Sequence, residues 1–276
     1  MKYLFFDIDG TLLSHEKGIL ESTVQALEQA KAQGHKLFIN TGRSLAEVGD
    51  SFDRFDFDGF VCAAGSHIII EGEEVFNQTI DHLDILDIID VLEELNISFG
   101  LEGIEHTYFS SRVYKGYHSK IKQSKENYAD KEINGFEPYH YMIQPKYVRP
   151  VEDYIENPTM INKMLIYPGD VEGSMKLKKR LSDNYHLIIY DTFAELINKG
   201  IDKATGIDVV IDYYGANLQD TLALGDSLND LEMIAHAGIG IAMGNAAQEV
   251  KQVADLIAPH LHEDGLYKAL QELEII

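Results

Sequence analysis

Short, largely apolar runs alternate with a helical pattern from residue 3 to residue 63, and this alternation constrains the fold more than any other feature. The runs Tyr3–Phe6, Lys36–Ile39 and Phe60–Ala63 are compact, as expected of strands buried on both faces. Between the first two runs, residues 20–32 carry apolar side chains at three-residue steps and end before Gly34. Strands joined by helices at this spacing predict right-handed crossovers and a parallel sheet.

The same order returns near the C-terminus, where residues 221–224 and 239–242 form two further apolar runs. A helical stretch at about 229–236 separates them, and helices are also expected near 245–254 and 264–273. The two ends of the chain therefore predict one α/β domain with a Rossmann-like parallel sheet.

The middle of the chain has a different pattern. Residues 81–190 begin with an amphipathic helix and continue with short strand-like runs at 107–109, 163–167 and 186–190. Prolines separate several of these runs. We therefore expect an inserted α+β cap domain at 81–190, and a core domain made of residues 1–80 and 191–276.

Composition narrows the class of protein. The 276 residues carry a formal net charge of −23, which argues against a nucleic-acid partner because phosphate backbones require clustered Lys and Arg. No run approaches the roughly 20 apolar residues of a membrane-spanning helix, and the N-terminus lacks the apolar region of a secretory signal. We therefore expect a cytoplasmic protein without membrane contact. Cys62 is the only cysteine, so no intrachain disulfide is expected, and its apolar surroundings predict burial.

Two aspartates follow the first strand directly, in the pentapeptide Asp7-Ile8-Asp9-Gly10-Thr11. Ligands of open parallel sheets bind beyond the carboxyl ends of the strands, and residues two apart on an extended chain point the same way. Close carboxylates repel each other, so the pair indicates a bound cation or a shared proton. A solvated turn is the alternative, since Asp and Gly are common in turns.

Two more polar clusters follow predicted strands. Asn40–Arg43 (NTGR) offers an anion a hydroxyl, a glycine amide and the start of a helix. Gly225–Asp230 (GDSLND) follows the strand at 221–224, where its acids either bind a cation or cap the next helix. Polar clusters at three strand ends are harder to ascribe to capping alone.

A lysine at the start of a helix is the last candidate. Lys203 precedes a helical pattern that runs to about residue 213, where a positive charge opposes the helix dipole. It therefore needs an anionic partner, for which a phosphate and Asp7 are both candidates. Lys199 is the competing lysine in the same segment.

Taken in their order along the chain, the four motifs resemble those of the haloacid dehalogenase (HAD) superfamily of phosphotransferases. The family motifs are DxDGT, a Ser or Thr, a Lys, and an acidic GDxxND. All four are present here without a departure. The NTGR and GDSLND segments and the position of the insert resemble the Cof-type branch, subclass IIB. The resemblance covers nearly the whole chain, and it implies a HAD-like core with the insert as a lid over the site.

The resemblance also implies a mechanism and a set of site residues. Asp7 would be the nucleophile that forms an aspartyl-phosphate, and Asp9 would be the general acid and base. Mg²⁺ would be held by Asp7, Asp226 and the backbone carbonyl of Asp9. Asp230 would support Lys203 or contact the metal from outside. The predicted phosphate- and substrate-binding residues are Gly10, Thr41, Gly42, Arg43, Lys203 and Asn229.

The implied function is Mg²⁺-dependent hydrolysis of small phosphate monoesters, such as sugar phosphates or similar metabolites. A phosphosugar mutase of the same fold is one alternative, because phosphomannomutases share the first motif. A non-catalytic phosphate-binding regulator is another, although it would be expected to have lost Asp7, Asp9 or Lys203. His260 and His262 resemble a metal-binding pair only superficially, and the basic segment 112–125 is expected to be a solvated face. The sequence leaves the substrate and the oligomeric state open.

Overall fold

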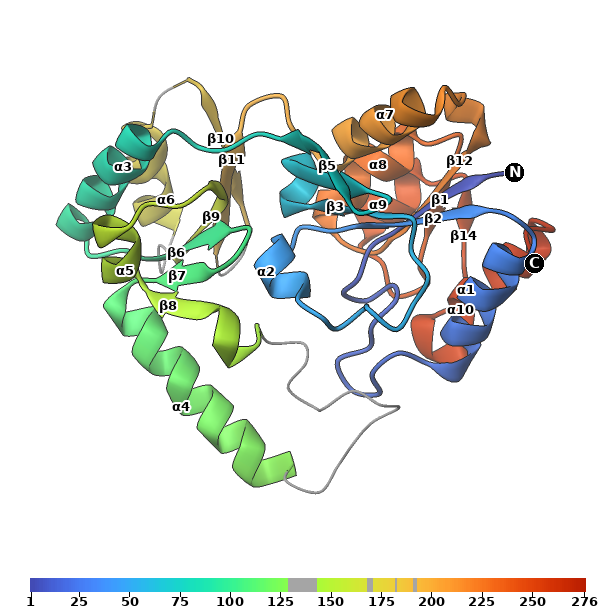
Figure 1. Cartoon of the computed structure of the whole chain (residues 1–276), viewed down its shortest axis with the longest axis horizontal. Helices are drawn as coiled ribbons and strands as arrows, with labels where there is room; N and C mark the ends of the chain where they lie inside the picture. Colours follow the sequence, from blue (N-terminus) through green and yellow to red (C-terminus); the bar gives the residue numbers. More distant parts are fainter. Residues whose placement is uncertain (129–142, 168–170, 182, 191–192) are drawn as a thin grey trace.

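Two β-sheets, each with its own helices and hydrophobic core, make up the part of the chain that the structure describes. The structure is a computed structural model, and it describes residues 1–128, 143–167, 171–181, 183–190 and 193–276. Figure 1 shows the larger sheet on the side of the molecule that carries both termini, and the smaller sheet on the other side.

The larger sheet has eight strands in the order β14-β13-β12-β1-β2-β3-β4-β5. The first six in this order are parallel, and β4 and β5 form an antiparallel hairpin at the edge. The five parallel strands expected from the sequence are confirmed, while β14 and the hairpin are additional. The strands are β1 (Tyr3–Phe6), β2 (Lys36–Asn40), β3 (Gly59–Cys62), β4 (His67–Ile70), β5 (Glu73–Asn77), β12 (Thr221–Gly225), β13 (Ile239–Ala242) and β14 (Leu256–Ile257).

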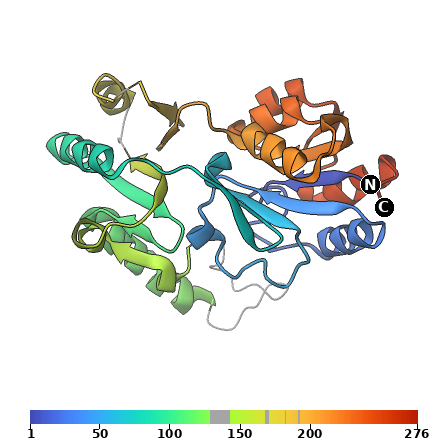
Figure 2. The same cartoon turned by 45° about the horizontal axis from the view of Figure 1, so that its top comes forward.

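Helices cover both faces of this sheet, which is why the run at residues 3–6 is apolar throughout. Leu4 and Phe6 belong to the core on the side of α1 and α10, whereas Tyr3 and Phe5 belong to the core on the side of α7 and α8. Figure 2 shows α1 and α7 on opposite sides of the sheet. The helices are α1 (Glu21–Ala32), α2 (Leu45–Val48), α7 (Lys203–Tyr214), α8 (Leu231–His236), α9 (Gln248–Val253) and α10 (Gly265–Glu272).

The smaller sheet has six strands in the order β10-β11-β9-β6-β7-β8, antiparallel except for the pair β7 and β8. One face packs against apolar side chains of α3 and α5. The strands are β6 (Ser98–Gly103), β7 (Thr107–Phe109), β8 (Val148–Pro150), β9 (Ile161–Tyr167), β10 (Tyr185–Ile189) and β11 (Ala194–Asn198). The helices are α3 (His82–Glu94), α4 (Ser111–Tyr128), α5 (Val151–Glu156) and α6 (Val171–Lys178).

The smaller sheet extends past the boundary expected at residue 190. Strand β11 pairs with both β9 and β10, so residues 194–198 belong to the sheet of the insert. Its alternate residues Ala194 and Leu196 pack into the core of that sheet. The polar residues Glu195 and Asn198, both buried, interrupt the apolar run and hide the strand from a search for apolar segments.

Two expectations from composition can be compared with the structure. Cys62 is fully buried on β3, so the prediction that it is a core residue is confirmed, and burial raises the pKa of its thiol to about 12. Among the described helices, none combines the length and the apolarity needed to cross a bilayer.

Candidate active site

The DxDGT, NTGR and GDSLND motifs, which follow β1, β2 and β12, meet at one edge of the larger sheet because parallel strands end on the same side. Asp7 follows β1 and donates its backbone N–H to Leu224 of β12, at 3.0 Å. Thr41 follows β2 and donates its backbone N–H to Val61 of β3, at 2.9 Å. The strand ends thereby place the acids, the hydroxyl and the GDSLND segment around a common point.

Lys203 lies at the centre of the buried charges. Its Nζ donates to Asp7 Oδ1 at 2.7 Å and to Asp230 Oδ1 at 2.5 Å, and the lysine side chain has no exposed surface. Burial opposes its charge, but the attraction of Asp230 and Asp7 outweighs burial and raises the pKa of Lys203. The sequence prediction that this lysine needs an anionic partner is confirmed. Lys199, the competitor, is exposed.

The start of α7 holds Lys203 in place. Asp202 caps the helix by accepting the backbone N–H of Thr205 at 2.9 Å, which offsets part of the unfavourable position of the lysine. Asn40 at the end of β2 donates its side-chain amide to the backbone carbonyl of Lys203, at 2.9 Å. The helix terminus is therefore fixed against the strand that carries the second motif.

Asp226 approaches the first motif closely. Gly10 has a φ of 85°, and a Cβ at this position would overlap the carboxylate of Asp226. Asn245 donates its side-chain amide to the Gly10 carbonyl at 2.9 Å and to Asp226 Oδ2 at 3.1 Å. The other oxygen, Asp226 Oδ1, is buried without a hydrogen-bond partner among the described residues.

These acids form a site that fits a divalent cation. Oxygens of Asp7, Asp226 and Asp230 lie within 4.8 Å of one another. Burial raises the pKa of Asp7, although Lys203 opposes this, and burial with the charge of Asp230 raises the pKa of Asp226 to about 7. One ammonium thus stands against three carboxylates, and hard oxygen ligands suit Mg²⁺.

Asp230 is already occupied by other partners. In addition to the contact with Lys203, its Oδ2 accepts the backbone N–H groups of Asp226 and Ser227, both at 2.9 Å. These bonds fix the loop that carries Asp226. The geometry favours Asp230 as a support for Lys203 over direct metal contact, and Asp226 as the acid with a free oxygen.

Arg43 holds the carboxylate of Asp9 with two hydrogen bonds. Nε of Arg43 donates to Oδ2 at 2.8 Å, and Nη2 donates to Oδ1 at 2.7 Å. Burial opposes ionisation of Asp9, but the guanidinium outweighs it and lowers the pKa of this acid. The sequence placed Arg43 among the phosphate-binding residues, and in this structure its side chain is directed to Asp9 instead.

A pocket of about 280 Å³ opens over these groups, between the two sheets. Six of the predicted site residues line it, namely Asp7, Asp9, Thr41, Gly42, Arg43 and Asn229. Gly10, Lys203, Asp226 and Asp230 do not line the pocket, but they are connected to Asp7 through the contacts of Lys203 and through the cluster of acids. The core motifs therefore form a pocket floor, which is connected to charged groups that do not line the pocket.

The sequence missed several pocket residues. Eight further residues line the pocket, and six of them belong to the smaller sheet or to the segment leading into β11. The eight residues are Glu47, Ser227, Glu102, Lys163, Leu165, Tyr167, Phe193 and Glu195. A signal for one of them was present, since Lys163 is a charged residue in the strand that the sequence predicts at 163–167. Asn245 carried no signal of its own, because its role depends on contacts with Gly10 and Asp226.

Two other groups lie outside this site. His262 Nε2 lies 2.7 Å from Ser14 Oγ, and the backbone N–H of His262 donates to Nδ1 of His260 at 3.1 Å, so neighbouring protein atoms already contact both rings.

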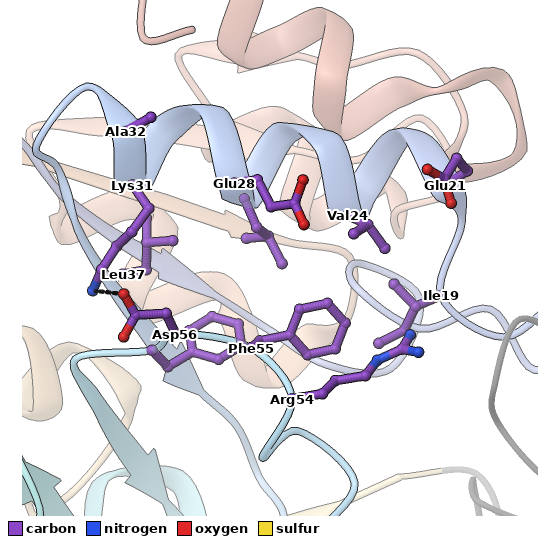
Figure 3. A pocket seen from close by; sticks show the side chains of 12 residues that line it. Ile19, Glu21, Val24, Glu28, Lys31, Ala32, Leu37, Arg54, Phe55 and Asp56 are labelled. Carbon is purple, nitrogen blue, oxygen red and sulfur yellow. Dashed lines mark ion pairs between the residues drawn. The ribbon is translucent and has the colours of Figure 1, made fainter.

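A second pocket of about 650 Å³ runs along α1, with Arg54 and Phe55 opposite the helix (Figure 3). None of the motif residues lines this second pocket.

A buried aspartate paired with a buried lysine, an excess of acids and a cap over the pocket define the class of phosphoryl-transfer enzymes that the motifs implied. The family model of haloacid dehalogenase-like hydrolases matches residues 4–270, so the chain belongs to this family. The resemblance and the α/β fold predicted from the sequence are confirmed.

Several curated and solved relatives are named phosphatases. The chain is 27% identical to the 5-amino-6-(5-phospho-D-ribitylamino)uracil phosphatase YitU of Bacillus subtilis, over 96% of this chain and 95% of the relative. It is similar to the solved HAD subclass IIB sugar phosphatase BT4131, with a TM-score of 0.80, 28% identity and full coverage of both chains. It is also similar to the HAD phosphatase BT1666 of Bacteroides thetaiotaomicron, with a TM-score of 0.81, 27% identity and coverage of 100% and 96%. The protein is a phosphatase of the HAD superfamily.

Proposed function

We propose that the protein hydrolyses monoesters of small phosphorylated metabolites through an aspartyl-phosphate on Asp7, with Mg²⁺ as cofactor. The observation that carries the proposal is the position of Asp7. It lines the pocket, it is 4% exposed, and a buried lysine fixes one of its oxygens. A carboxylate held in this way is an oriented nucleophile whose charge has been partly neutralised.

The excess negative charge supports a metal requirement. The carboxylates of Asp7 and Asp226 and the backbone carbonyl of Asp9 would hold the ion, which supplies positive charge against the phosphate. The buried Asp226 Oδ1, without a hydrogen-bond partner in the described chain, is the atom that most needs such a ligand.

In the first step an oxygen of Asp7 attacks phosphorus, and the bond between phosphorus and the ester oxygen breaks. Asp9 donates its proton to the departing oxygen. In the second step Asp9 takes a proton from water, whose oxygen attacks the same phosphorus and releases Asp7. Thr41, the Gly42 amide and Asn229 line the pocket beside Asp7 and would hold the phosphoryl oxygens.

Arg43 gives Asp9 a way to serve in both steps. With the guanidinium in place the pKa of Asp9 is lowered, which keeps Asp9 in the ionised form that can accept a proton from water. A phosphate dianion in the pocket competes for the same guanidinium. If Arg43 moves toward the phosphate, Asp9 loses its counter-charge, its pKa rises, and it can carry the proton for the leaving group.

The substrate class follows from the small pocket and from the named relatives. The pocket of about 280 Å³ lies just below the usual range for ligand sites, about 300–1,000 Å³, so it fits a small ligand. A structural neighbour is named a sugar phosphatase, and a sequence relative is named a phosphatase of a phosphoribitylamino compound. Both names support a sugar phosphate or a similar metabolite as the substrate here.

A panel of phosphorylated metabolites, assayed for phosphate release with Mg²⁺, tests the proposal. We expect Asp7→Asn to lower kcat by about 10³-fold or more, because an amide cannot replace the nucleophile. Asp53→Asn, at an exposed position of the same domain, is the matched control and should keep wild-type rates. Retention of more than a tenth of the activity by Asp7→Asn would contradict the proposed nucleophile.

A further inference from the structure

Three neighbouring strands of the smaller sheet present charged side chains to the pocket. Lys163 of β9, Glu102 of β6 and Glu195 of β11 all line it. Glu102 pairs directly with Lys163 across β6 and β9, and Glu195 is opposite Leu165 on the neighbouring strand. Next to these charged residues along the three strands are Leu101, Met164 and Leu196, which pack into the hydrophobic core on the other face. Alternation therefore reserves one face of these strands for the pocket.

Lys163 has its protons committed to protein acceptors. Its Nζ donates to the Gly42 carbonyl at 2.6 Å and to Glu195 Oε1 at 2.8 Å, and it lies 3.0 Å from Glu102 Oε2. Two of its three protons are thus donated to Gly42 and Glu195, and Glu102 forms an ion pair with the same ammonium group. The side chain is only 3% exposed, so Lys163 holds the two glutamates in place and connects them to the phosphate-binding loop of the core.

Glu102 retains acceptor capacity that no described residue uses. Its side chain is 1% exposed, and neither of its carboxylate oxygens has a hydrogen-bond partner among the described residues, although Oε2 lies within ion-pair distance of Lys163. A buried carboxylate oxygen without a donor is costly, so the geometry requires a donor from outside the chain. Burial and the nearby charge of Glu47 raise the pKa of Glu102, because both disfavour the ionised form of this carboxyl group.

The pocket wall has more acidic than basic charge. Glu47 of the core also lines the pocket, so three carboxylates stand against the single ammonium of Lys163 on this side of the site. The aromatic side chains of Tyr167 and Phe193 also line the pocket. Such a wall accepts hydrogen bonds from hydroxyl groups and repels a second anionic group on the ligand.

We propose that Glu102 and Glu195, positioned by Lys163, bind the hydroxyl groups of an uncharged polyol leaving group and reject leaving groups that carry a carboxylate or a second phosphate. This inference rests on the proposed function, because it concerns the alcohol that leaves when phosphate is transferred. It makes the two glutamates specificity-determining residues of the cap, and it narrows the substrates to singly phosphorylated sugars or alditols.

Two phosphate esters of equal chain length test the inference. Sorbitol 6-phosphate and 6-phosphogluconate differ only at the far end, where a hydroxymethyl group is replaced by a carboxylate. We expect the wild-type kcat/KM to be about 100-fold higher for the sorbitol ester, because a carboxylate placed beside Glu102 is repelled in a site with little water. Hexyl phosphate, which lacks the hydroxyl groups, should also be a poor substrate.

The variants Glu102→Gln and Glu195→Gln keep side-chain size and remove one charge each. Both should lower the ratio of kcat/KM for sorbitol 6-phosphate over 6-phosphogluconate by about tenfold, mainly through KM. A ratio measured in one protein preparation cancels any loss of folded enzyme. Glu93→Gln, at an exposed position of α3, is the matched control and should keep the wild-type ratio.

The outcomes separate this inference from the proposed function. A wild-type ratio below about 3, or a ratio that neither glutamine variant changes, would overturn the glutamate subsite while leaving Asp7 as the nucleophile. A failure of the proposed function looks different, because neither these esters nor p-nitrophenyl phosphate would then be hydrolysed in a manner that depends on Asp7. A high ratio that falls in both glutamine variants supports the inference.

Discussion

Replacement of Lys203 by Met should destabilise the protein and slow the reaction, because it removes the ammonium that Asp7 and Asp230 share. The lysine side chain is fully buried, and its Nζ lies 2.7 Å from Asp7 and 2.5 Å from Asp230. Methionine fills a similar volume, so the main change is electrical and leaves two buried carboxylates without their counter-ion. Removal of one partner from a buried ion pair costs about 3–5 kcal/mol.

The size of the chain converts this energy into a measurable shift. One kcal/mol changes the Tm of a large domain by about 2–4 °C, so we expect the Tm of Lys203→Met to fall by about 6–20 °C. The pKa of Asp7 should rise further without Lys203, and kcat should fall by about 100-fold or more. The assays are urea and thermal unfolding followed by circular dichroism in EDTA, and initial rates with Mg²⁺.

Lys199→Met is the matched control, because this lysine is exposed and lies four residues earlier in the chain. Its free energy of unfolding should stay within about 0.5 kcal/mol of wild type. The double variant Lys203→Met with Asp230→Asn should regain part of the lost stability, since one uncompensated carboxylate is removed. A Lys203→Met protein within about 1 kcal/mol of wild type would refute the buried charge cluster as described.

Three further predictions concern the metal site and the core. Mg²⁺ at 100 times its Kd should stabilise the wild type by about 2.7 kcal/mol, and Asp226→Asn should abolish most of the increase in Tm. Asp58 is half-buried, which opposes its ionisation, but hydrogen bonds from Lys31 and Lys36 outweigh this and lower its pKa. Its stabilising effect is therefore present above its unfolded pKa and is lost as the pH falls below about 4, so urea unfolding of Asp58→Asn should differ most from wild type near neutral pH. A Cβ at Gly206 would overlap the side chain of Val61, so Gly206→Ala should lower the free energy of unfolding by about 1–3 kcal/mol in urea.

The central part of the site was predictable because its signals are local. Asp7, Thr41 and Asp226 each follow a strand whose apolar run is visible in the sequence, and parallel strands bring their carboxyl ends together. The sequence favoured Lys203 over Lys199, and the structure shows the physical reason. The reason lies at the start of α7, where the Asp202 cap directs the chain so that residue 203 points inward.

The hairpin β4–β5 was missed although a local signal existed. Its turn consists of Glu71 and Gly72, both with positive φ, which is the requirement of a two-residue hairpin turn. The apolar run Ile68–Ile70 before it and the apolar pair Val75 and Phe76 after it complete the pattern.

The cap wall was not predictable from local patterns. Lys163, Glu102 and Glu195 lie on three strands that are far apart in the sequence, and each glutamate looks like a surface residue by itself. Their burial makes sense only when the strands pair and Lys163 neutralises part of their charge. Tertiary pairing, rather than propensity, determines this part of the site.

The central claim is that Asp7 becomes phosphorylated during turnover, and Asp9→Asn allows this to be measured directly. In p-nitrophenyl phosphate the leaving group needs no proton, so the first step should proceed in Asp9→Asn while the second step, which needs Asp9 as base, is slow. After brief mixing with ester labelled at phosphorus and quenching in acid, we expect the label on the peptide that contains Asp7, and its release by hydroxylamine. Asp7→Asn should carry no label. Label at another residue, or equal labelling of Asp7→Asn, would contradict the account.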